Sequence, residues 1–508
     1  MKQSLALEIM LEGESVLLTG QAGAGKTYVL NEFIRHAKKQ GRTVAVTATT
    51  GLAATHLGGN TIHAWSGIGV FDELPKNFFK QLSKGREEII RKTDVLIIDE
   101  ISMLHDYRLD MIDAIARKVR EQEDAPFGGL QVVLCGDFFQ LPPVNRNDSR
   151  TGQFVVHSKA WQGLEPVICY LSEQHRQDDE TFLEILTAIR AGDVRRRHAE
   201  ALLARIDTPV PGDQEITELH TTNIDVDGIN SAALRQLPGD EYSYTMITTG
   251  AANYVDQLKR SCLALEELVL KEGSLVMCIK NAQDRKYVNG SLGVVTGFEE
   301  DTYYPIVELR NGKKFTMRPD TWELRDGTKK RASITQLPLR LAWAITIHKS
   351  QGMTLDAARI DLRKAFVEGM GYVALSRVKR LDSLSLIGIN KKAIQVSPDA
   401  LAIDAYLQEQ SVKDAKRFKK LEKQATKRAK EKPSTQKAKT PWTERLEEMR
   451  KTYPKAFTPW AATDDQALLT YFNEGMGLSD LSAKLGRQPG GIKARLQKHL
   501  GEEITIPS

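Results

Sequence analysis

A glycine-rich segment near the N-terminus constrains the fold of this chain more than any other feature. Residues 20–27 read GQAGAGKT, directly after an apolar run at 16–18 and directly before the amphipathic stretch YVLNEFIRHAKK. Gly20 and Gly25 stand where a G-x-x-x-x-G-K-[ST] phosphate loop needs them, because missing side chains let successive backbone N–H groups turn toward phosphate oxygens. A loop of this kind between a strand and a helix predicts an α/β fold of the P-loop nucleoside-triphosphatase class.

The loop predicts a site for ATP and Mg²⁺. Lys26 is expected to reach the β- and γ-phosphates, and the Thr27 hydroxyl to bind Mg²⁺. The predicted nucleotide-binding residues of the loop are Gly20, Gly23, Ala24, Gly25, Lys26 and Thr27. A glycine-rich turn with an unrelated lysine is the alternative, and the flanking strand and helix argue against it.

A second segment, DVLIIDE at 94–100, has the character of a buried parallel strand that ends in two carboxylates. Ligands of open α/β sheets bind at this edge, so Asp99 is predicted to hold Mg²⁺ and Glu100 to orient and deprotonate the attacking water. Read alone, the segment could equally be an acidic exit from a strand. The phosphate loop upstream favours the catalytic interpretation.

Three further polar side chains are candidates for sensing the γ-phosphate. Gln140 follows the apolar run in LQVVLCGDFFQLPPV, Arg176 lies in LSEQHRQ and Arg377 lies in GYVALSRVKR. Two arginines so far apart in sequence can meet at one phosphate only in a cleft between two domains. Either arginine could equally be a surface cation, and their motif contexts favour the catalytic interpretation.

The composition describes a multidomain chain with a locally basic segment. A length of 508 residues suits about three or four domains. No apolar run approaches the roughly 20 residues that span a membrane, so no membrane partner and a cytoplasmic location are expected, nucleoid-associated if the source is prokaryotic. The four cysteines are widely spaced and are expected to be buried free thiols. Residues 411–440 hold twelve Lys/Arg against three Asp/Glu, a surplus larger than the net charge of +5, so the remaining chain is net negative.

The stretch VAVTATTGLAATHLGGNTIHAWSGIG at 44–69 supplies candidate contacts to DNA. Thr49 and Thr50 are suited to phosphate contacts, and the His63 imidazole could stack on a base. The alternative interpretation is an ordinary turn followed by core aromatics.

In order and content, these motifs resemble the Pif (petite integration frequency) family of superfamily-one DNA helicases, close to the RecD group. The resemblance covers about residues 1–390 and includes RLDMIDAIARKVREQEDAPFGGLQ at 108–131, which is similar to the segment that separates this family from RecD-like relatives. It implies two RecA-like motor domains, 5′-to-3′ translocation on single-stranded DNA, unwinding of tailed duplex and often of G-quadruplex DNA, and roles in DNA repair, recombination and telomere maintenance. A monomeric motor is expected.

The resemblance also implies roles for residues outside the phosphate loop. Gln3 stands where the family places a glutamine that reads adenine. In TIHKSQGMTLD, Lys349 and Ser350 are candidates for DNA phosphates, His348 is a DNA-side candidate, and Gly352 allows close approach to the triphosphate.

The predicted domain organisation follows from changes in composition and in the pattern of apolar residues along the sequence. We expect a first RecA-like motor domain at 1–185 and a second at 186–270 and 336–410. A small inserted β-barrel at 271–335 is signalled by Asn-Gly turns at 289–290 and 311–312. A basic linker at 411–440, read as a solvated helix or disordered segment, precedes a Myb-like or helix-turn-helix module at 441–508, with Thr463 and Ser479 as helix caps. DNA contact and docking of a protein partner are both open for this module.

Two alternatives to a Pif-like motor remain. One is a RecD-like recombination or repair helicase, which the 108–131 segment disfavours. The other is a nonmotor, DNA-stimulated ATPase, which uses the same folds without stepping.

Overall fold

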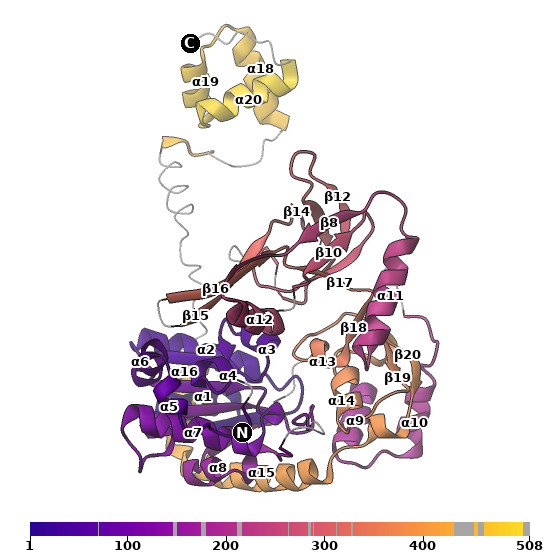
Figure 1. The fold of residues 1–508 in the computed structure, drawn as a ribbon. Helices are drawn as coiled ribbons and strands as arrows, with labels where there is room; N and C mark the ends of the chain where they lie inside the picture. The colour runs from indigo at the N-terminus through magenta and orange to yellow at the C-terminus, as the bar shows by residue number, and fades with distance from the viewer. Residues whose placement is uncertain are drawn as a thin grey trace. The chain divides into compact units, whose positions relative to one another are not determined.

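The protein is described by a computed structural model, which divides into two compact units, Met1–Thr426 and Lys427–Ser508 (Figure 1). The structure describes residues 1–430, 452–455 and 462–500, except 70, 146–149, 174–178, 211–215, 263, 283–285, 288, 311 and 327–328. Arg176 therefore lies outside the described residues. Among the described residues, no helix is long and apolar enough to cross a membrane. Cys135, Cys169, Cys262 and Cys278 are buried free thiols, as predicted.

The first motor domain is a six-stranded parallel sheet in the order β3-β2-β4-β5-β1-β6. Its strands are nearly continuous apolar runs, because helices cover both faces of the sheet. The strands are β1 (Val16–Gly20), β2 (Val44–Ala48), β3 (Asn60–Thr61), β4 (Val95–Asp99), β5 (Gln131–Gly136) and β6 (Val167–Leu171). The helices are α1 (Gln3–Leu11), α2 (Lys26–Lys39), α3 (Gly51–His56), α4 (Ile62–Ser66), α5 (Phe78–Gln81), α6 (Lys84–Lys92), α7 (Asp106–Arg120) and α8 (Lys159–Leu164).

The second motor domain has a four-stranded parallel sheet in the order β18-β7-β19-β20. Its strands are β7 (Thr217–His220), β18 (Ala344–Thr346), β19 (Ala358–Leu362) and β20 (Leu384–Ile389). Its helices are α9 (Glu180–Arg190), α10 (Arg196–Leu203), α11 (Asn223–Gln236), α13 (Ile347–Ser350) and α14 (Met370–Leu375). Two parallel α/β sheets confirm the predicted fold class.

A β-rich insertion separates β7 from β18 and begins earlier than the predicted residue 271. Its elements are β8 (Tyr242–Thr245), β9 (Ile247–Gly250), α12 (Ala252–Ser261), β10 (Glu267–Leu270), β11 (Leu275–Cys278), β12 (Leu292–Phe298), β13 (Pro305–Leu309), β14 (Lys314–Thr316), β15 (Asp320–Asp326), β16 (Lys329–Gln336) and β17 (Leu339–Leu341). Among the described residues the main sheet runs β14-β13-β12-β11-β17 with two open edges, and Leu268 and Leu270 of β10 join its core. The predicted β-domain is thus present, as small sheets around a core rather than one closed barrel.

The two Asn-Gly pairs have different roles in this insertion. Gly312, with φ +77°, closes a tight turn between β13 and β14, where its N–H donates to Leu309 O at 2.8 Å. Asn311 lies outside the described residues. Asn289 and Gly290 instead end a longer connection between β11 and β12, so they do not form a two-residue hairpin.

The helix α15 (Pro398–Arg417) corrects the prediction that residues 411–440 form a solvated linker. Ser411 Oγ accepts from Tyr170 N at 3.2 Å, and Asp414 Oδ2 accepts from Ile168 N at 2.8 Å. Both amides belong to β6, the edge strand of the first sheet, whose outward N–H groups need acceptors. Phe418 packs against the same domain, and α16 (Glu422–Lys430) follows. The sequence did not predict this contact, because the segment is rich in basic residues, which are typical of an exposed surface. Residues 431–440 lie outside the described residues.

The second unit contains the predicted three short helices, α18 (Ala462–Asn473), α19 (Leu478–Leu485) and α20 (Pro489–Leu500). They enclose a core of Leu468, Leu481, Leu485, Ile492 and Leu496. The two cap predictions are wrong, because Thr463 lies inside α18 and Ser479 inside α19, whose N-cap is Gly477. Each of these two helices starts earlier than the pattern indicated, and in α19 the extra residue, Leu478, packs against the core.

Candidate active site

The phosphate loop connects the end of β1 to the start of α2, and two of its glycines are required by close contacts. Gly20 has φ +144°, and a Cβ there would approach Leu171 O to 2.8 Å. Gly25 has φ +83°, and a Cβ there would collide with the side-chain amide of Gln3. The loop therefore curls as its glycine positions predict, with its backbone close to β6 and to α1.

Gln3, the first residue of α1, lies against this loop. Its Nε2 donates to Ala24 O at 3.0 Å, and its backbone N donates to Glu173 Oε2 at 3.0 Å. The adenine-reading role of Gln3 stays a prediction, but the side chain is held beside the loop as that role requires.

A cavity of about 320 Å³ opens in front of the loop. Its walls come from both motor domains and include most of the predicted nucleotide residues: Gly23, Gly25, Lys26, Thr27, Asp99, Glu100, Gln140, Gly352 and Arg377. Lys26 Nζ donates to Gly20 O at 2.7 Å and to Gln21 O at 3.1 Å. The ammonium group must exchange these two carbonyls for phosphate oxygens when a nucleotide binds.

The two carboxylates at the end of β4 face the cavity in different ways. Asp99 ends the strand, whereas Glu100 has φ +55°, a left-handed backbone conformation that ends the extended run. Burial raises the pKa of Asp99. Burial, together with the neighbouring Asp99 charge, raises the pKa of Glu100 to about 7. A carboxylate that titrates near neutral pH is suited to accept a proton from water.

The donor set at this edge fits Mg²⁺. Thr27 and Asp99 both line the cavity, and burial of two adjacent carboxylates leaves negative charge that a cation would offset. Mg²⁺ usually takes few protein ligands and fills its shell with water and substrate phosphates.

Gln351 from the second motor domain contacts two residues of the cavity wall, and the sequence motifs gave it no individual role. Its buried side-chain Nε2 donates to Glu100 Oε2 at 2.8 Å and to Gln140 Oε1 at 3.1 Å. Thr354 and Lys379 were also missed, and both line the cavity. The available signal was adjacency, because Gln351 directly precedes Gly352.

The second domain also contacts the phosphate loop itself. Tyr372 Oη, from α14, accepts from Ala22 N at 3.1 Å. Arg377 is fully buried at the cavity wall, where Nη1 donates to Ser350 O and Met353 O, both at 3.1 Å, and Nε donates to Val373 O at 2.7 Å. The structure thus brings Arg377 to the nucleotide cavity, and its action on the γ-phosphate stays a prediction.

The first domain's DNA candidates line a groove of about 1130 Å³ between that domain and the β-rich insertion. Thr49, Thr50 and His63 all line it, together with Tyr254 and Trp322 from the insertion. Thr49 Oγ1 donates to Glu100 O at 3.0 Å and therefore connects this groove to the catalytic strand end.

His63 lies in the groove and contacts Arg108, and its predicted base stacking stays a prediction. Burial and the nearby Arg108 charge lower the pKa of His63 to about 4, so the ring is neutral near pH 7. Arg108 Nη1 donates to His63 Nε2 at 3.0 Å, and Arg108 Nη2 forms an ion pair with Asp72 Oδ1 at 3.0 Å. The histidine therefore orients an arginine of the 108–131 segment within the groove.

The three predicted DNA-contact residues of the second domain lie in different environments. Lys349 Nζ donates to Asn223 Oδ1 at 3.0 Å, at the start of α11. His348 is partly exposed, and its ring lies near that of Phe366. Ser350 is fully buried and its hydroxyl donates to Ile347 O at 2.8 Å, so the structure does not support the predicted contact of this hydroxyl with DNA.

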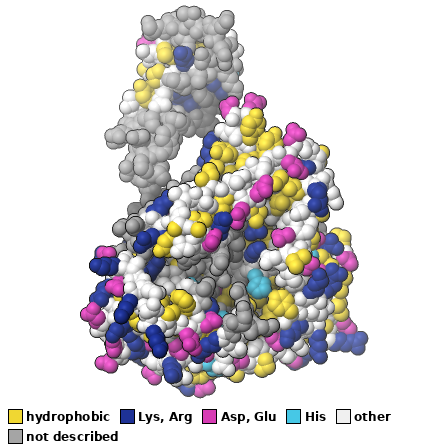
Figure 2. Space-filling model, viewed as in Figure 1, with side chains coloured by type: hydrophobic (Ala, Val, Ile, Leu, Met, Phe, Trp, Pro, Cys, Tyr) yellow, Lys and Arg dark blue, Asp and Glu magenta, His cyan; other side chains and the backbone are white. Residues whose placement is uncertain are grey.

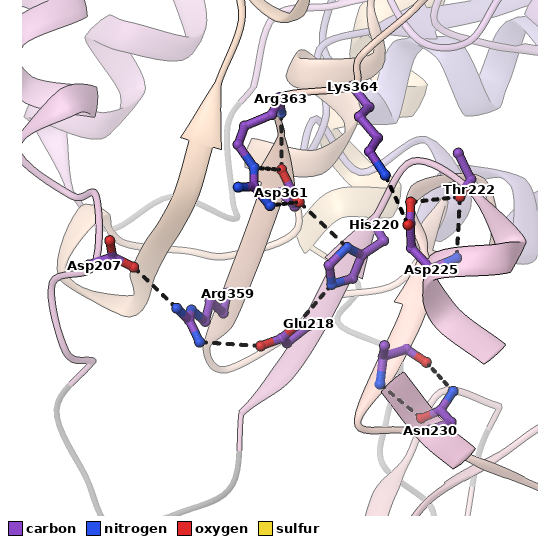
Figure 3. Close-up of polar contacts among 11 residues, drawn as sticks. Asp207, Glu218, His220, Thr222, Asp225, Asn230, Arg359, Asp361, Arg363 and Lys364 are labelled. Carbon is purple, nitrogen blue, oxygen red and sulfur yellow. Dashed lines mark hydrogen bonds and ion pairs between the residues drawn. The ribbon is translucent and has the colours of Figure 1, made fainter. Parts of the chain in front are cut away.

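A network of ion pairs fixes the same edge of the second domain (Figure 3). Asp225 accepts from Thr222 Oγ1 at 2.7 Å and from Lys364 Nζ at 3.0 Å. His220 lies between Glu218, at 2.8 Å, and Asp361, at 3.8 Å. These contacts join the ends of β7 and β19 to the start of α11, where Asn223 in turn holds Lys349.

Comparisons with known proteins agree with this geometry. The family described as PIF1-like helicase matches residues 3–200, and the family described as DNA helicase Pif1, 2B domain, matches residues 253–298. The ATP-dependent DNA helicase Pif1 of Psychrobacter sp. (strain PRwf-1) is 40% identical over 486 residues, covering 84% of this chain and 73% of that protein. The human ATP-dependent DNA helicase PIF1 is 38% identical, covering 80% of this chain and 63% of its own length.

Solved structures give the same result. The Pif1 helicase from Candida albicans has a TM-score of 0.70 at 34% identity and covers 80% of this chain and 98% of its own. Bacteroides sp Pif1 in complex with ADP-AlF4 has a TM-score of 0.68 at 31% identity, covering 80% and 97%. Bacteroides Pif1 bound to ssDNA has a TM-score of 0.61 at 32% identity, with the same coverage.

Proposed function

Because the chain belongs to the Pif1-like helicase family, we propose that it couples ATP hydrolysis between its two motor domains to 5′-to-3′ movement on single-stranded DNA, and thereby unwinds tailed duplexes. One observation carries the proposal: Gln351 of the second domain hydrogen-bonds Glu100 and Gln140 of the first, at 2.8 and 3.1 Å. The complete cavity therefore exists only when the two domains are closed on each other. Such a site links each hydrolysis event to a domain movement.

The residues of the cavity have separate roles in hydrolysis. Lys26 would leave the Gly20 and Gln21 carbonyls for the phosphates, and Thr27 and Asp99 would hold Mg²⁺, which neutralises phosphate charge. Glu100 accepts the proton of the attacking water, and Gln351 fixes the carboxylate that does so. Arg377 would stabilise charge on the transferred phosphoryl group after exchanging part of its carbonyl contacts.

The finer features of the function are extensions of this proposal and are supported by family resemblance. They are activity on G-quadruplex DNA, a role in genome maintenance, a cytoplasmic or nucleoid-associated location, and action as a monomer. A similar solved structure, 32% identical with a TM-score of 0.60, concerns DNA unwinding at forked dsDNA by two coordinating Pif1 helicases, which supports tailed duplex as the substrate form and does not support action as a monomer.

The C-terminal unit is proposed to dock a protein rather than to read DNA. Arg495 forms a bidentate pair with Asp465, at 2.7 and 2.6 Å, and Arg487 pairs with Asp464 at 2.7 Å. Arg495 lies on α20, and its pairing occupies a cation that a DNA-reading helix would otherwise offer to phosphates, while Arg487 lies between α19 and α20. Binding of the full chain and of a 1–430 truncation to tailed duplex should show the same salt dependence. A steeper slope for the full chain would assign DNA contacts to residues 431–508.

Strand displacement tests the motor function directly. Substrates with a 5′ tail, a 3′ tail and a quadruplex are compared for the unmodified protein, Lys26→Ala, and Lys39→Ala as a matched control at the exposed end of the same helix. We expect ATP-dependent displacement of the 5′-tailed duplex, lost in Lys26→Ala and retained in Lys39→Ala. DNA-stimulated ATP hydrolysis without displacement of any substrate would instead identify a nonmotor ATPase.

A further inference from the structure

A buried arginine of the second motor domain joins four other segments of the chain. Arg190, the last residue of α9, is only 4% exposed, whereas Lys and Arg side chains are spread over the surface in Figure 2. Its Nη1 donates to Asp137 Oδ1 at 2.6 Å, and its Nη2 donates to Tyr170 Oη and Asp404 Oδ1, both at 3.0 Å. Tyr372 Oη lies 3.5 Å from Nη1. These five side chains, from α9, the end of β5, β6, α15 and α14, form the Arg190 cluster.

The centre of the Arg190 cluster is a buried ion pair. The Asp137 side chain is fully buried, and within the described part of the chain no hydrogen-bond donor reaches its Oδ2. The Phe139 ring lies beside the guanidinium, with 4.1 Å from its centroid to the Arg190 guanidinium carbon. Removing the cation would leave a carboxylate buried without compensation, which is strongly unfavourable. Arg190 therefore fixes the position of Asp137.

Asp137 begins the turn that carries Gln140 to the nucleotide cavity. Its Oδ1 also accepts from Phe139 N at 3.2 Å, and its backbone O accepts from Gln140 N at 3.0 Å. The start of α14 lies against the same turn, since a Cβ on Gly369 would approach Phe139 O to 2.6 Å and Gln140 O to 2.8 Å. A displacement of Arg190 would therefore act on the turn that holds Gln140.

The Arg190 cluster reaches the phosphate loop by a second route. Tyr372 Oη accepts from Ala22 N at 3.1 Å, and Ala22 lines the nucleotide cavity as Gln140 does. Burial raises the pKa of Tyr372, so its hydroxyl is neutral near pH 7. Arg190 thus contacts the supports of two residues in the cavity wall, one in the phosphate loop and one after β5.

We propose that Arg190 is a positioning residue for ATP hydrolysis, which ties the turn that carries Gln140 to the Tyr372 contact with the phosphate loop. The inference rests on the proposed function and gives a role to a residue outside the nucleotide motifs of the sequence. Both nitrogens of the guanidinium are needed, because Nη1 contacts Asp137 while Nη2 contacts Asp404 on α15. The hydrolysis step is therefore linked to α15 as well.

DNA-stimulated ATP turnover of the full chain tests this role, with ATP affinity and thermal unfolding measured alongside. Arg190→Lys keeps the buried charge but offers one nitrogen in place of two. We expect kcat to fall about ten- to hundredfold, the effect of one charge-assisted hydrogen bond expressed in the hydrolysis step. ATP affinity should change only a few-fold, because Lys26 is untouched. Arg196→Lys, at an arginine of the same domain whose side chain is 91% exposed, is the matched control and should behave as the unmodified protein.

A double variant separates positioning from stability. Arg190→Met/Asp137→Asn removes both charges of the buried pair and keeps an oxygen that can accept from Phe139 N. It should unfold at a higher temperature than Arg190→Met, because no charge is left buried alone. Its kcat should nevertheless stay about tenfold or more below that of the unmodified protein. Recovery of kcat in the double variant would overturn the inference, because Arg190 would then only balance the charge of Asp137.

Asp404→Ala tests the edge of the Arg190 cluster, where the side chain is 14% exposed and the buried ion pair is kept. It should lower kcat about three- to tenfold with unchanged ATP affinity. Glu409→Ala, at an exposed carboxylate of the same helix, should have no effect.

The outcomes distinguish the inference from the proposed function. An unchanged kcat in Arg190→Lys would refute the positioning role, and an unchanged kcat in Asp404→Ala would refute the link to α15. In both cases ATP turnover and strand displacement by the unmodified protein would still uphold the proposed function. An unmodified protein without DNA-stimulated ATP turnover would refute both.

Discussion

Gln351→Ala should separate the closure of the nucleotide cleft from the binding of ATP. The variant removes two hydrogen bonds made by one Nε2 atom, to Glu100 Oε2 at 2.8 Å and to Gln140 Oε1 at 3.1 Å. A hydrogen bond to a charged group contributes about 1.5–3 kcal/mol. If that stabilisation is expressed in the hydrolysis step, kcat should fall by about 10- to 150-fold, since each 1.36 kcal/mol is a factor of ten. The phosphate loop, which binds the nucleotide, is untouched.

The assay is DNA-stimulated ATP turnover measured over a range of ATP concentrations. Gln351→Ala should lower the stimulated kcat, with the KM for ATP unchanged within a few-fold and little effect on the slow rate without DNA. Gln395→Ala, at an exposed glutamine of the same domain, is the matched control and should behave as the unmodified protein. A large rise in KM with an unchanged kcat would refute the reasoning, because Gln351 would then contribute to binding rather than to the closed catalytic state.

Further variants test the rest of the site and fold. Lys26→Ala should abolish ATP turnover, whereas Glu100→Gln should bind ATP but not hydrolyse it, which nucleotide-binding and turnover assays distinguish. Arg377→Ala should slow hydrolysis by about 10³-fold or more with ATP affinity changed only a few-fold. The pKa of His63 is about 4 in the folded state against 6.5 for the ordinary side chain, so the unfolded state binds more protons between these values. The free energy of unfolding should therefore fall as pH drops from 6.5 toward 4, less so in His63→Gln, as measured by urea titration. Truncation to 1–410 should destabilise the motor relative to 1–430 in thermal unfolding, because it removes the Asp414 contact to β6.

The nucleotide site was predictable because its chemistry is local. Each of its motifs is a short run in which strand, turn and functional side chain are adjacent, so GQAGAGKT and DVLIIDE determine both the element and the residue at its end. Parallel sheets bring such ends to one edge, and the structure places Lys26, Thr27, Asp99, Glu100 and Gln140 around one cavity. The position of Arg377 required only that a second domain close on the first.

The contacts that the sequence did not predict join distant segments. Gln351 reaches Glu100 across 251 positions, and Asp414 reaches the edge of β6 across 246. Hydrophobic periodicity predicts which face of a helix is apolar. However, α15 packs against β6 partly through the Ser411 hydroxyl and the Asp414 carboxylate, and residues of these types are expected at the surface. The contact between His63 and Arg108 was not predicted for a related reason. Its ring is held by Arg108 and by burial, neither of which its own neighbours in sequence reveal.

The arrangement of α13 explains how hydrolysis could move DNA. This helix has only four residues, and it carries His348 and Lys349, which are predicted to contact DNA. Gln351, which contacts Glu100, and Gly352, which lines the nucleotide cavity, follow it directly. At about 1.5 Å of rise per helical residue, the two groups are separated by only a few ångströms along the chain, and one helical turn is too short to absorb a displacement between them. Ser350 anchors that turn, since its hydroxyl donates to Ile347 O and its carbonyl accepts from Arg377. If loss of the γ-phosphate shifts Gln351 or Arg377, we expect Lys349 and the His348 ring to shift with them, so that a strand bound there would move with the second domain.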